Sequence, residues 1–137
     1  MIPRYFTAFA LGAALVAAVV PGTAQAMIDM VPGARGVAKS APLGDCSVRA
    51  KAALTSVLAN PYEAGPGTGQ WSAAGPLDAS GNASAAAAIH CFPVGKGYVV
   101  TLTCAVQIPT NEASARDLCA RLETAFGSEQ SGGITWR

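Results

Sequence analysis

The stretch IHCFPVGKGYVVTLTC, residues 89–104, decides the fold. Two runs in it alternate between apolar and other side chains, and Gly95-Lys96 separates them. Because successive side chains of a strand point to opposite faces of a sheet, this alternation predicts two strands with one buried face. A two-residue turn with glycine in first place suits a type II′ β-hairpin. We therefore predict that the two runs pair as an antiparallel hairpin.

The turn also predicts the register of the hairpin. It pairs Val94 with Gly97, which brings Cys91 opposite Val100. In this register each residue of one apolar face meets a residue of the other apolar face. A slip of one residue would set Cys91 against the polar side of its partner strand. We therefore expect the register in which the two apolar faces coincide.

An amphipathic helix is predicted on each side of the hairpin. The first covers about residues 45–59, with Asp45 as its N-cap, and the second covers about residues 110–127. Apolar side chains recur at helical spacing in both, and each apolar stripe includes one cysteine, Cys46 or Cys119. Both of these cysteines are therefore expected to face the sheet.

Four cysteines in an exported chain predict two disulfides. In the expected register Cys91 and Cys104 lie ~13 Å apart along the strands, whereas a disulfide needs Cα atoms within ~7 Å. Each strand cysteine is therefore expected to bond with a helix cysteine. The last helix must turn back over the strand before it, which brings Cys119 level with Cys104. This geometry favours the pairs Cys104–Cys119 and Cys46–Cys91.

These elements predict an α+β fold: a two-layer sandwich in the order helix, two or three antiparallel strands, helix, with two disulfides. The optional third strand lies around Trp71. Residues 27–44 contain scattered glycine and proline without periodicity, so we expect a flexible N-terminal tail there. Residues 45–137 are expected to form a single domain.

The first 26 residues have the pattern of a secretory signal peptide. Arg4 precedes an apolar run, and Ala24-Gln25-Ala26 forms a small-x-small cleavage site. The apolar run is shorter than the ~20 residues that span a membrane, although a membrane anchor is the alternative. We therefore predict residues 1–26 as a signal peptide, no membrane span after cleavage, and a secreted or periplasmic protein.

Composition and motifs argue against several function classes. The formal net charge is +1 and no basic cluster occurs, so no nucleic-acid binding is predicted. His90 is the only histidine, no C-x-x-C or G-x-S-x-G motif occurs, and no cofactor or resident metal is expected. Two alternatives stay open: a small hydrolase that uses His90 as its base, and a zinc site formed by His90 with the cysteines.

The face of the hairpin opposite the cysteines suggests a binding surface. It carries His90, Phe92 and Val99, and the strand around Trp71 is expected to extend it. An uncovered apolar face of this kind marks contact with a protein partner or a second copy. The alternative is that residues 61–84 or the C-terminal residues 134–137 fold over it. The sequence thus predicts a non-catalytic binding or envelope-associated domain.

A series of short motifs gives the chain a general resemblance. They are C-x-x-x-A…L, W-x-A-x-G, A-x-I-x-C, V-V-T-L-T-C and L-C-x-x-L, spread from Cys46 to about Phe126. In this order they resemble small exported bacterial proteins of unknown function. The resemblance implies export and a small α+β fold, and it implies no activity.

Overall fold

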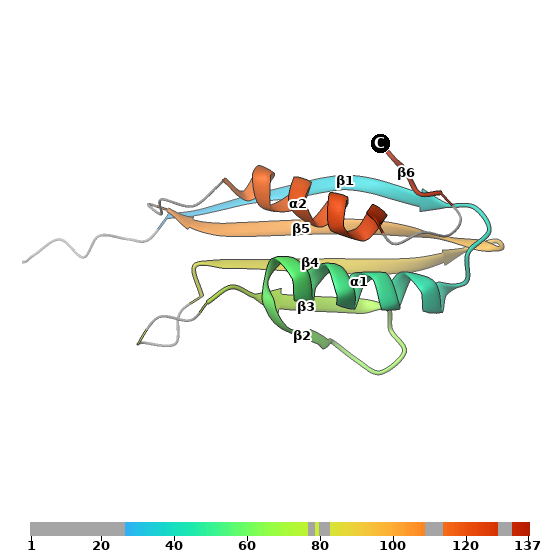
Figure 1. Ribbon diagram of the computed structural model, residues 1–137, viewed down its shortest axis with the longest axis horizontal. Helices are drawn as coiled ribbons and strands as arrows, with labels where there is room; N and C mark the ends of the chain where they lie inside the picture. The colour runs from blue at the N-terminus through green and yellow to red at the C-terminus, as the bar shows by residue number, and fades with distance from the viewer. Residues whose placement is uncertain (1–26, 77–78, 80–82, 109–113, 129–132) are drawn as a thin grey trace, which may run out of the picture.

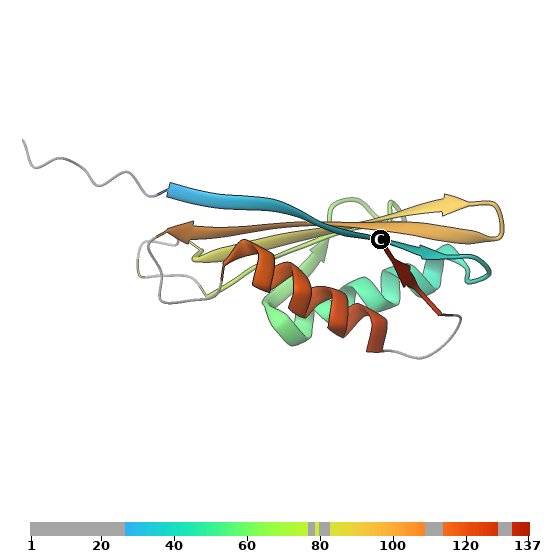
Figure 2. The same cartoon turned by 90° about the horizontal axis from the view of Figure 1, so that it is seen from above.

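The computed structural model describes residues 27–76, 79, 83–108, 114–128 and 133–137. Six strands form one antiparallel sheet in the order β2-β3-β4-β5-β1-β6. Two helices lie side by side on one face of this sheet (Figure 1, Figure 2). The elements are β1 (Met27–Ala38), α1 (Leu43–Val57), β2 (Ala59–Glu63), β3 (Gln70–Ala74), β4 (Ala85–Val94), β5 (Gly97–Ile108), α2 (Ala115–Ser128) and β6 (Thr135–Trp136).

The hairpin of β4 and β5 has the predicted register. Val94 pairs with Gly97, and Cys91 pairs with Val100. Gly95 begins the turn with φ of 60°, a left-handed conformation that glycine adopts without steric cost. The hairpin therefore places its apolar alternation on one face, and that face meets the two helices.

The predicted fold of two or three strands between two helices is wrong, because the molecule is built on a six-stranded sheet. Much of the difference is β1, which occupies residues expected to be a flexible tail and pairs antiparallel with β5. Its helix-facing positions include Gly33 and Gly36 in place of large apolar residues. A Cβ at Gly33 would lie 2.9 Å from Sγ of Cys119. The close approach of α2 thus requires glycine at this position. Because these glycines interrupt the alternation of apolar and polar residues, the sequence did not predict this strand.

Both predicted disulfides are present. Cys46–Cys91 joins α1 to β4 with a Cα–Cα distance of 6.0 Å, and Cys104–Cys119 joins α2 to β5 with 5.7 Å. All four cysteines are buried within the apolar layer between sheet and helices. Each helix is therefore attached covalently to the strand beneath it.

A polar cluster lies beneath the start of α1. The Tyr98 hydroxyl donates to Oδ2 of Asp45 over 3.0 Å, and Arg49 Nε donates to the same oxygen over 2.8 Å. The prediction of Asp45 as the N-cap is wrong, because the helix begins at Leu43 after Pro42. Asp45 lies in the first turn of α1 and accepts hydrogen bonds from these two side chains. Burial of Tyr98, with added contributions from Asp45, raises the pKa of its hydroxyl well above the ordinary value.

The predicted signal peptide, residues 1–26, lies outside the residues that the structure describes. Within the described part of the chain, neither helix is long and apolar enough to cross a membrane.

Candidate functional site

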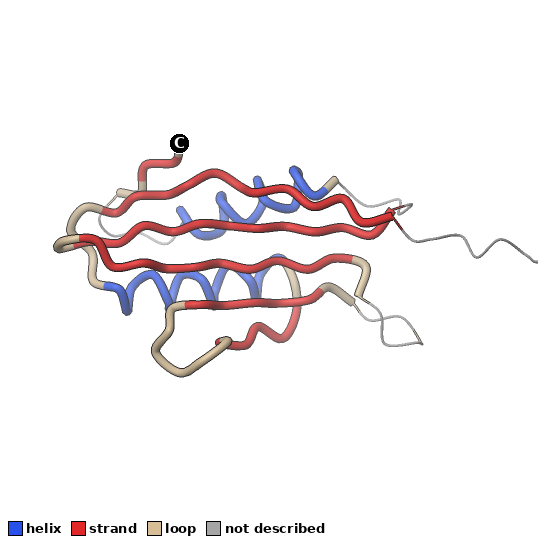
Figure 3. Tube along the Cα trace, turned by 180° about the vertical axis from the view of Figure 1, so that it is seen from behind, coloured by secondary structure: helices blue, strands red, loops and turns tan. Residues whose placement is uncertain are grey.

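The sheet face opposite the helices is the candidate site (Figure 3). Strand pairing aligns His90 with Thr101 and Phe92 with Val99, and these side chains point away from the helix-covered face. The same face continues over β3 and β1, so it extends across most of the sheet. Its central residues on β4 and β5 are Ala86, Ala88, His90, Phe92, Val99, Thr101, Thr103 and Ala105.

The composition of this face is unusual for a solvent-exposed sheet. Antiparallel sheets with one covered face normally carry polar and charged side chains on the other face. Here most outward positions of the described strands are alanine, threonine or larger apolar residues. The other polar ones are Gln70, Ser72, His90 and Gln107, and Arg35 is the only one with a permanent charge. The residues of the five strands β1 to β5, at ~3.3 Å rise each and ~4.8 Å strand spacing, give a face of ~700 Å².

His90 and Phe92 lie together on the open face. Their ring centroids are 6.2 Å apart and the rings meet edge to face at 71°. Phe92 keeps 45% of its surface exposed. An aromatic ring held this way offers apolar contact area at low conformational cost, which is typical of residues that anchor protein interfaces.

Val99 shares the face and is only 8% exposed. It lies between Phe92 on β4 and Val37 on β1, its two cross-strand neighbours. Val99 therefore supports Phe92 from the side and offers little surface of its own to a partner.

Trp71, the fourth predicted contact residue, lies on the other face. It pairs with Ile89, whose side chain is buried beneath the helices. Lys51 of α1 places its ammonium 5.9 Å from the centre of the indole ring. Trp71 therefore belongs to the packing between α1 and the sheet, and it is separated from His90 and Phe92 by the thickness of the sheet.

Tyr62 takes the place expected for Trp71. It stands opposite Ser72 on the open face and is largely exposed. Beside it, the small side chains of β3, β4 and β5 leave an open depression of about 280 Å³. No pattern in the sequence indicated this residue, because β2 is short and its register is interrupted between Ala59 and Tyr62.

The described residues leave this face uncovered. The C-terminal segment, predicted as an alternative cover, forms β6 at the edge beside β1. Its Trp136 packs against Phe126 of α2, with ring centroids 5.8 Å apart, and therefore lies on the helix side. Residues 70–74, within the other proposed cover, are a strand of the sheet itself.

The arrangement around His90 gives no support to catalysis or metal binding. Among the described residues, no carboxylate forms a hydrogen bond or an ion pair with His90, and all four cysteines are in disulfides. No group of three His, Cys, Asp or Glu side chains in the described ranges lies close enough to hold a metal ion. A hydrolase base needs a substrate cleft and an orienting partner, and His90 stands on a flat face.

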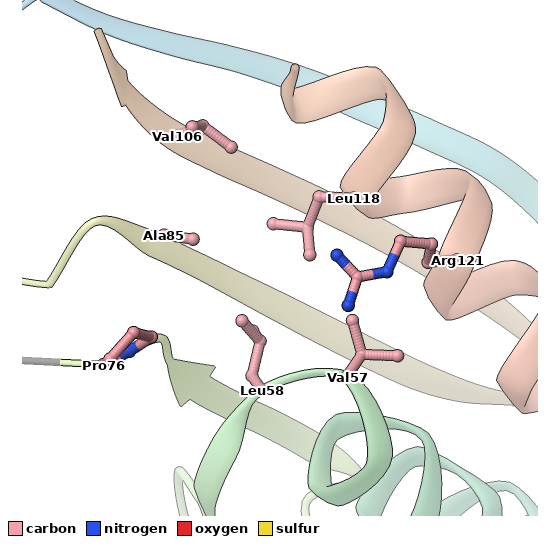
Figure 4. A pocket seen from close by; sticks show the side chains of 7 residues that line it. All are labelled: Val57, Leu58, Pro76, Ala85, Val106, Leu118 and Arg121. Carbon is pink, nitrogen blue, oxygen red and sulfur yellow. The ribbon is translucent and has the colours of Figure 1, made fainter. Parts of the chain in front are cut away.

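A second hollow lies on the helix side, between the end of α1 and the start of α2 (Figure 4). Val57, Leu58, Val106 and Leu118 line it with apolar surface, and the guanidinium of Arg121 extends across it. Its volume is about 280 Å³, at the lower limit of small-molecule sites. The hollow is therefore better explained as the seam where two helices diverge than as a ligand site.

No family model, no curated protein and no solved structure matches the chain.

Proposed function

We propose that this chain is an exported, disulfide-bonded binding domain that holds a protein partner on the open face of its sheet and has no catalysis of its own. The observation that supports this proposal is the composition of that face. It is broad, nearly uncharged and rich in small and apolar residues, whereas the surface of an exported domain normally carries charges of both signs.

Area and shape favour a protein over a small molecule. The ~700 Å² of the face is close to the ~800 Å² that each partner buries in a standard protein interface. Exposed Phe92 and Tyr62 stand on it, and small residues lie beside Tyr62, an arrangement that suits a broad surface on the partner. Small-molecule sites, in contrast, are concave and enclose most of their ligand.

Export is part of the proposal. The two disulfides and the signal-peptide pattern of residues 1–26 support an oxidising compartment, either the periplasm or the medium outside a bacterial cell. In such a compartment the two disulfides stay oxidised and hold both helices on the sheet, so the open face keeps a fixed shape.

The test compares two variants with matched chemistry. Phe92→Ser combined with Tyr62→Ser changes the open face, while Val48→Ser removes an exposed apolar residue from the outer side of α1. Cross-linking and affinity capture from the native compartment should recover the same partner with the native chain and with Val48→Ser. The double variant should lose that partner while keeping its thermal midpoint. Equal recovery by all three chains would refute the proposal.

A further inference from the structure

We propose that two copies of this chain pair through the free edges of their β1 strands and form one continuous antiparallel sheet. This surface is distinct from the open face described above. It is the outer edge of β1 between Met27 and Pro32, where no other described strand is paired.

The other parts of the sheet border are closed to strand addition. At the far border, β2 is short, contains Pro61 and has Asn60 at φ of 49°. Along β1 itself, Arg35 exchanges two main-chain hydrogen bonds with Arg137 beside β6, and the Ala34 N–H donates to Oε1 of Glu123. Proteins blunt exposed sheet edges in these ways. In the remaining stretch of β1 the only proline is Pro32 at its end, and residues 27–31 contain no proline or bulge.

The free stretch offers its main-chain groups outward in a defined order. The hydrogen bond from Gln107 N to Ser84 O shows which residues of β5 turn their main chain toward β4. By strand alternation Thr103 belongs to that set, so its partner Pro32 turns its nitrogen to the open edge. Met30 and Ile28, two and four residues earlier, turn their N–H and C=O groups the same way.

These groups complement a second copy in one register. With Met30 opposite Met30 of the second copy, each Met30 N–H donates to the other Met30 carbonyl. Each Ile28 N–H then donates to the Pro32 C=O of the other copy. Pro32 has no N–H to return, so the Ile28 C=O receives no hydrogen bond across the junction. A register centred on Asp29 would set two carboxylates opposite each other, which is unfavourable. The Met30-centred register sets each Asp29 opposite Val31.

The side chains favour the same arrangement. Ile28 and Met30 are 68% and 64% exposed, and both lie on the open face of β1. In the proposed pair they form one apolar cluster across the junction, next to Pro32 of each copy. The pairing ends at the bulge between Pro32 and Arg35, so β6 of either copy is not displaced. The open faces of the two copies then become one surface.

The experiment measures the mass of the exported, disulfide-bonded chain by sedimentation over a wide concentration range. The native chain should be a dimer at high concentration. Met30→Pro removes the central outward N–H and leaves the ladder to β5 intact, so this variant should sediment as a monomer with a native thermal midpoint. A native chain that stays monomeric, or a dimer that Met30→Pro leaves intact and Phe92→Ser abolishes, would overturn the proposal.

Cross-linking tests the register and does not depend on the folding of Met30→Pro. In the proposed dimer the two Met30 Cα atoms lie ~5.5 Å apart, within disulfide range. The two Ile28 Cα atoms lie ~13 Å apart along the strands, beyond it. Mild oxidation should therefore link Met30→Cys into a covalent dimer and leave Ile28→Cys unlinked. Equal linking of both variants, or linking of neither, would contradict this pairing.

Discussion

Tyr98 and Asp45 join the sheet to α1 through a hydrogen bond of 3.0 Å from the buried tyrosine hydroxyl to Oδ2 of the carboxylate. Arg49 donates to the same oxygen from the next turn of the helix. The cluster thus orients α1 on the sheet in the same helical turn in which Cys46 bonds with Cys91.

Replacement of Tyr98 by phenylalanine removes this hydrogen bond and preserves the ring. We expect a loss of about 1–2 kcal/mol in the free energy of unfolding at neutral pH, because Asp45 loses a partner in a partly buried place. Urea denaturation followed by circular dichroism measures it. A Tyr62→Phe variant, changed at an exposed tyrosine, should keep the native midpoint.

The same hydroxyl gives stability a specific alkaline dependence. The pKa of Tyr98 is raised in the folded state, so the folded chain holds its proton at pH values where the unfolded chain releases it. The contribution of protonated Tyr98 to the free energy of unfolding is therefore complete below about pH 10. Above that pH it declines by about 1.4 kcal/mol per pH unit. Tyr98→Phe should lack this component. Parallel slopes for native and variant chains above pH 10 would contradict the assignment.

Removal of each disulfide tests how much the two covalent ties contribute. Cys46 and Cys91 are 45 residues apart, and Cys104 and Cys119 are 15 apart. In the chain-entropy description, replacement of both cysteines by alanine should cost about 4 kcal/mol for the first pair and about 3 kcal/mol for the second. Denaturant titration of the two double variants gives the order. A larger loss for the shorter loop would show that packing around Cys119 dominates.

The sequence predicted those parts of the fold that depend on local patterns. Gly95 and the alternation around it are neighbours in the chain, so the turn, the register and the faces of both cysteines followed from a few residues. The disulfide pairing then followed from the lengths of strand and helix. None of these steps required knowledge of distant segments.

The rest of the fold depends on contacts between distant segments. Gly33 lies in a strand that pairs with β5, and α2 packs closely against it. The sequence of residues 27–38 alone indicates neither contact. Trp71 faces the helices because β3 pairs with β4 in the register that sets it opposite Ile89. Without that register, either face of the sheet is compatible with the sequence around Trp71. The open face was predicted correctly for His90 and Phe92, which lie on the hairpin itself.

One local signal was missed. Ser114 and Asp117 exchange hydrogen bonds at the start of α2: Ser114 N donates to Oδ2 of Asp117, and Asp117 N donates to the Ser114 hydroxyl oxygen. This is a capping-box arrangement, recognisable from a serine followed three residues later by an acidic residue. The helix starts at Ala115, whereas residues 110–113, at the predicted start of this helix, lie outside the described residues.

Substitution of Gly33 tests the close approach of α2 to β1. Alanine there would meet Sγ of Cys119 and Cβ of Leu102, both at 2.9 Å, and neither atom is at the end of a flexible side chain. We expect Gly33→Ala to cost about 1–3 kcal/mol through overpacking. The control is Gly44→Ala in the first turn of α1, where an added Cβ meets nothing within 4 Å. It should be neutral or stabilising, by up to about 1 kcal/mol.

A matched pair of substitutions distinguishes a strand at residues 27–38 from a flexible tail. Val31 faces the helices opposite Cys104, whereas Ile28 faces outward and is largely exposed. In a strand, Val31→Asn places an amide against the apolar layer and should cost about 1–2 kcal/mol, while Ile28→Asn should stay within about 0.5 kcal/mol of native. In a tail both would be neutral. Thermal unfolding at low protein concentration, where the chain is expected to be monomeric, distinguishes the two cases. Equal midpoints for both variants would show that residues 27–38 form a tail.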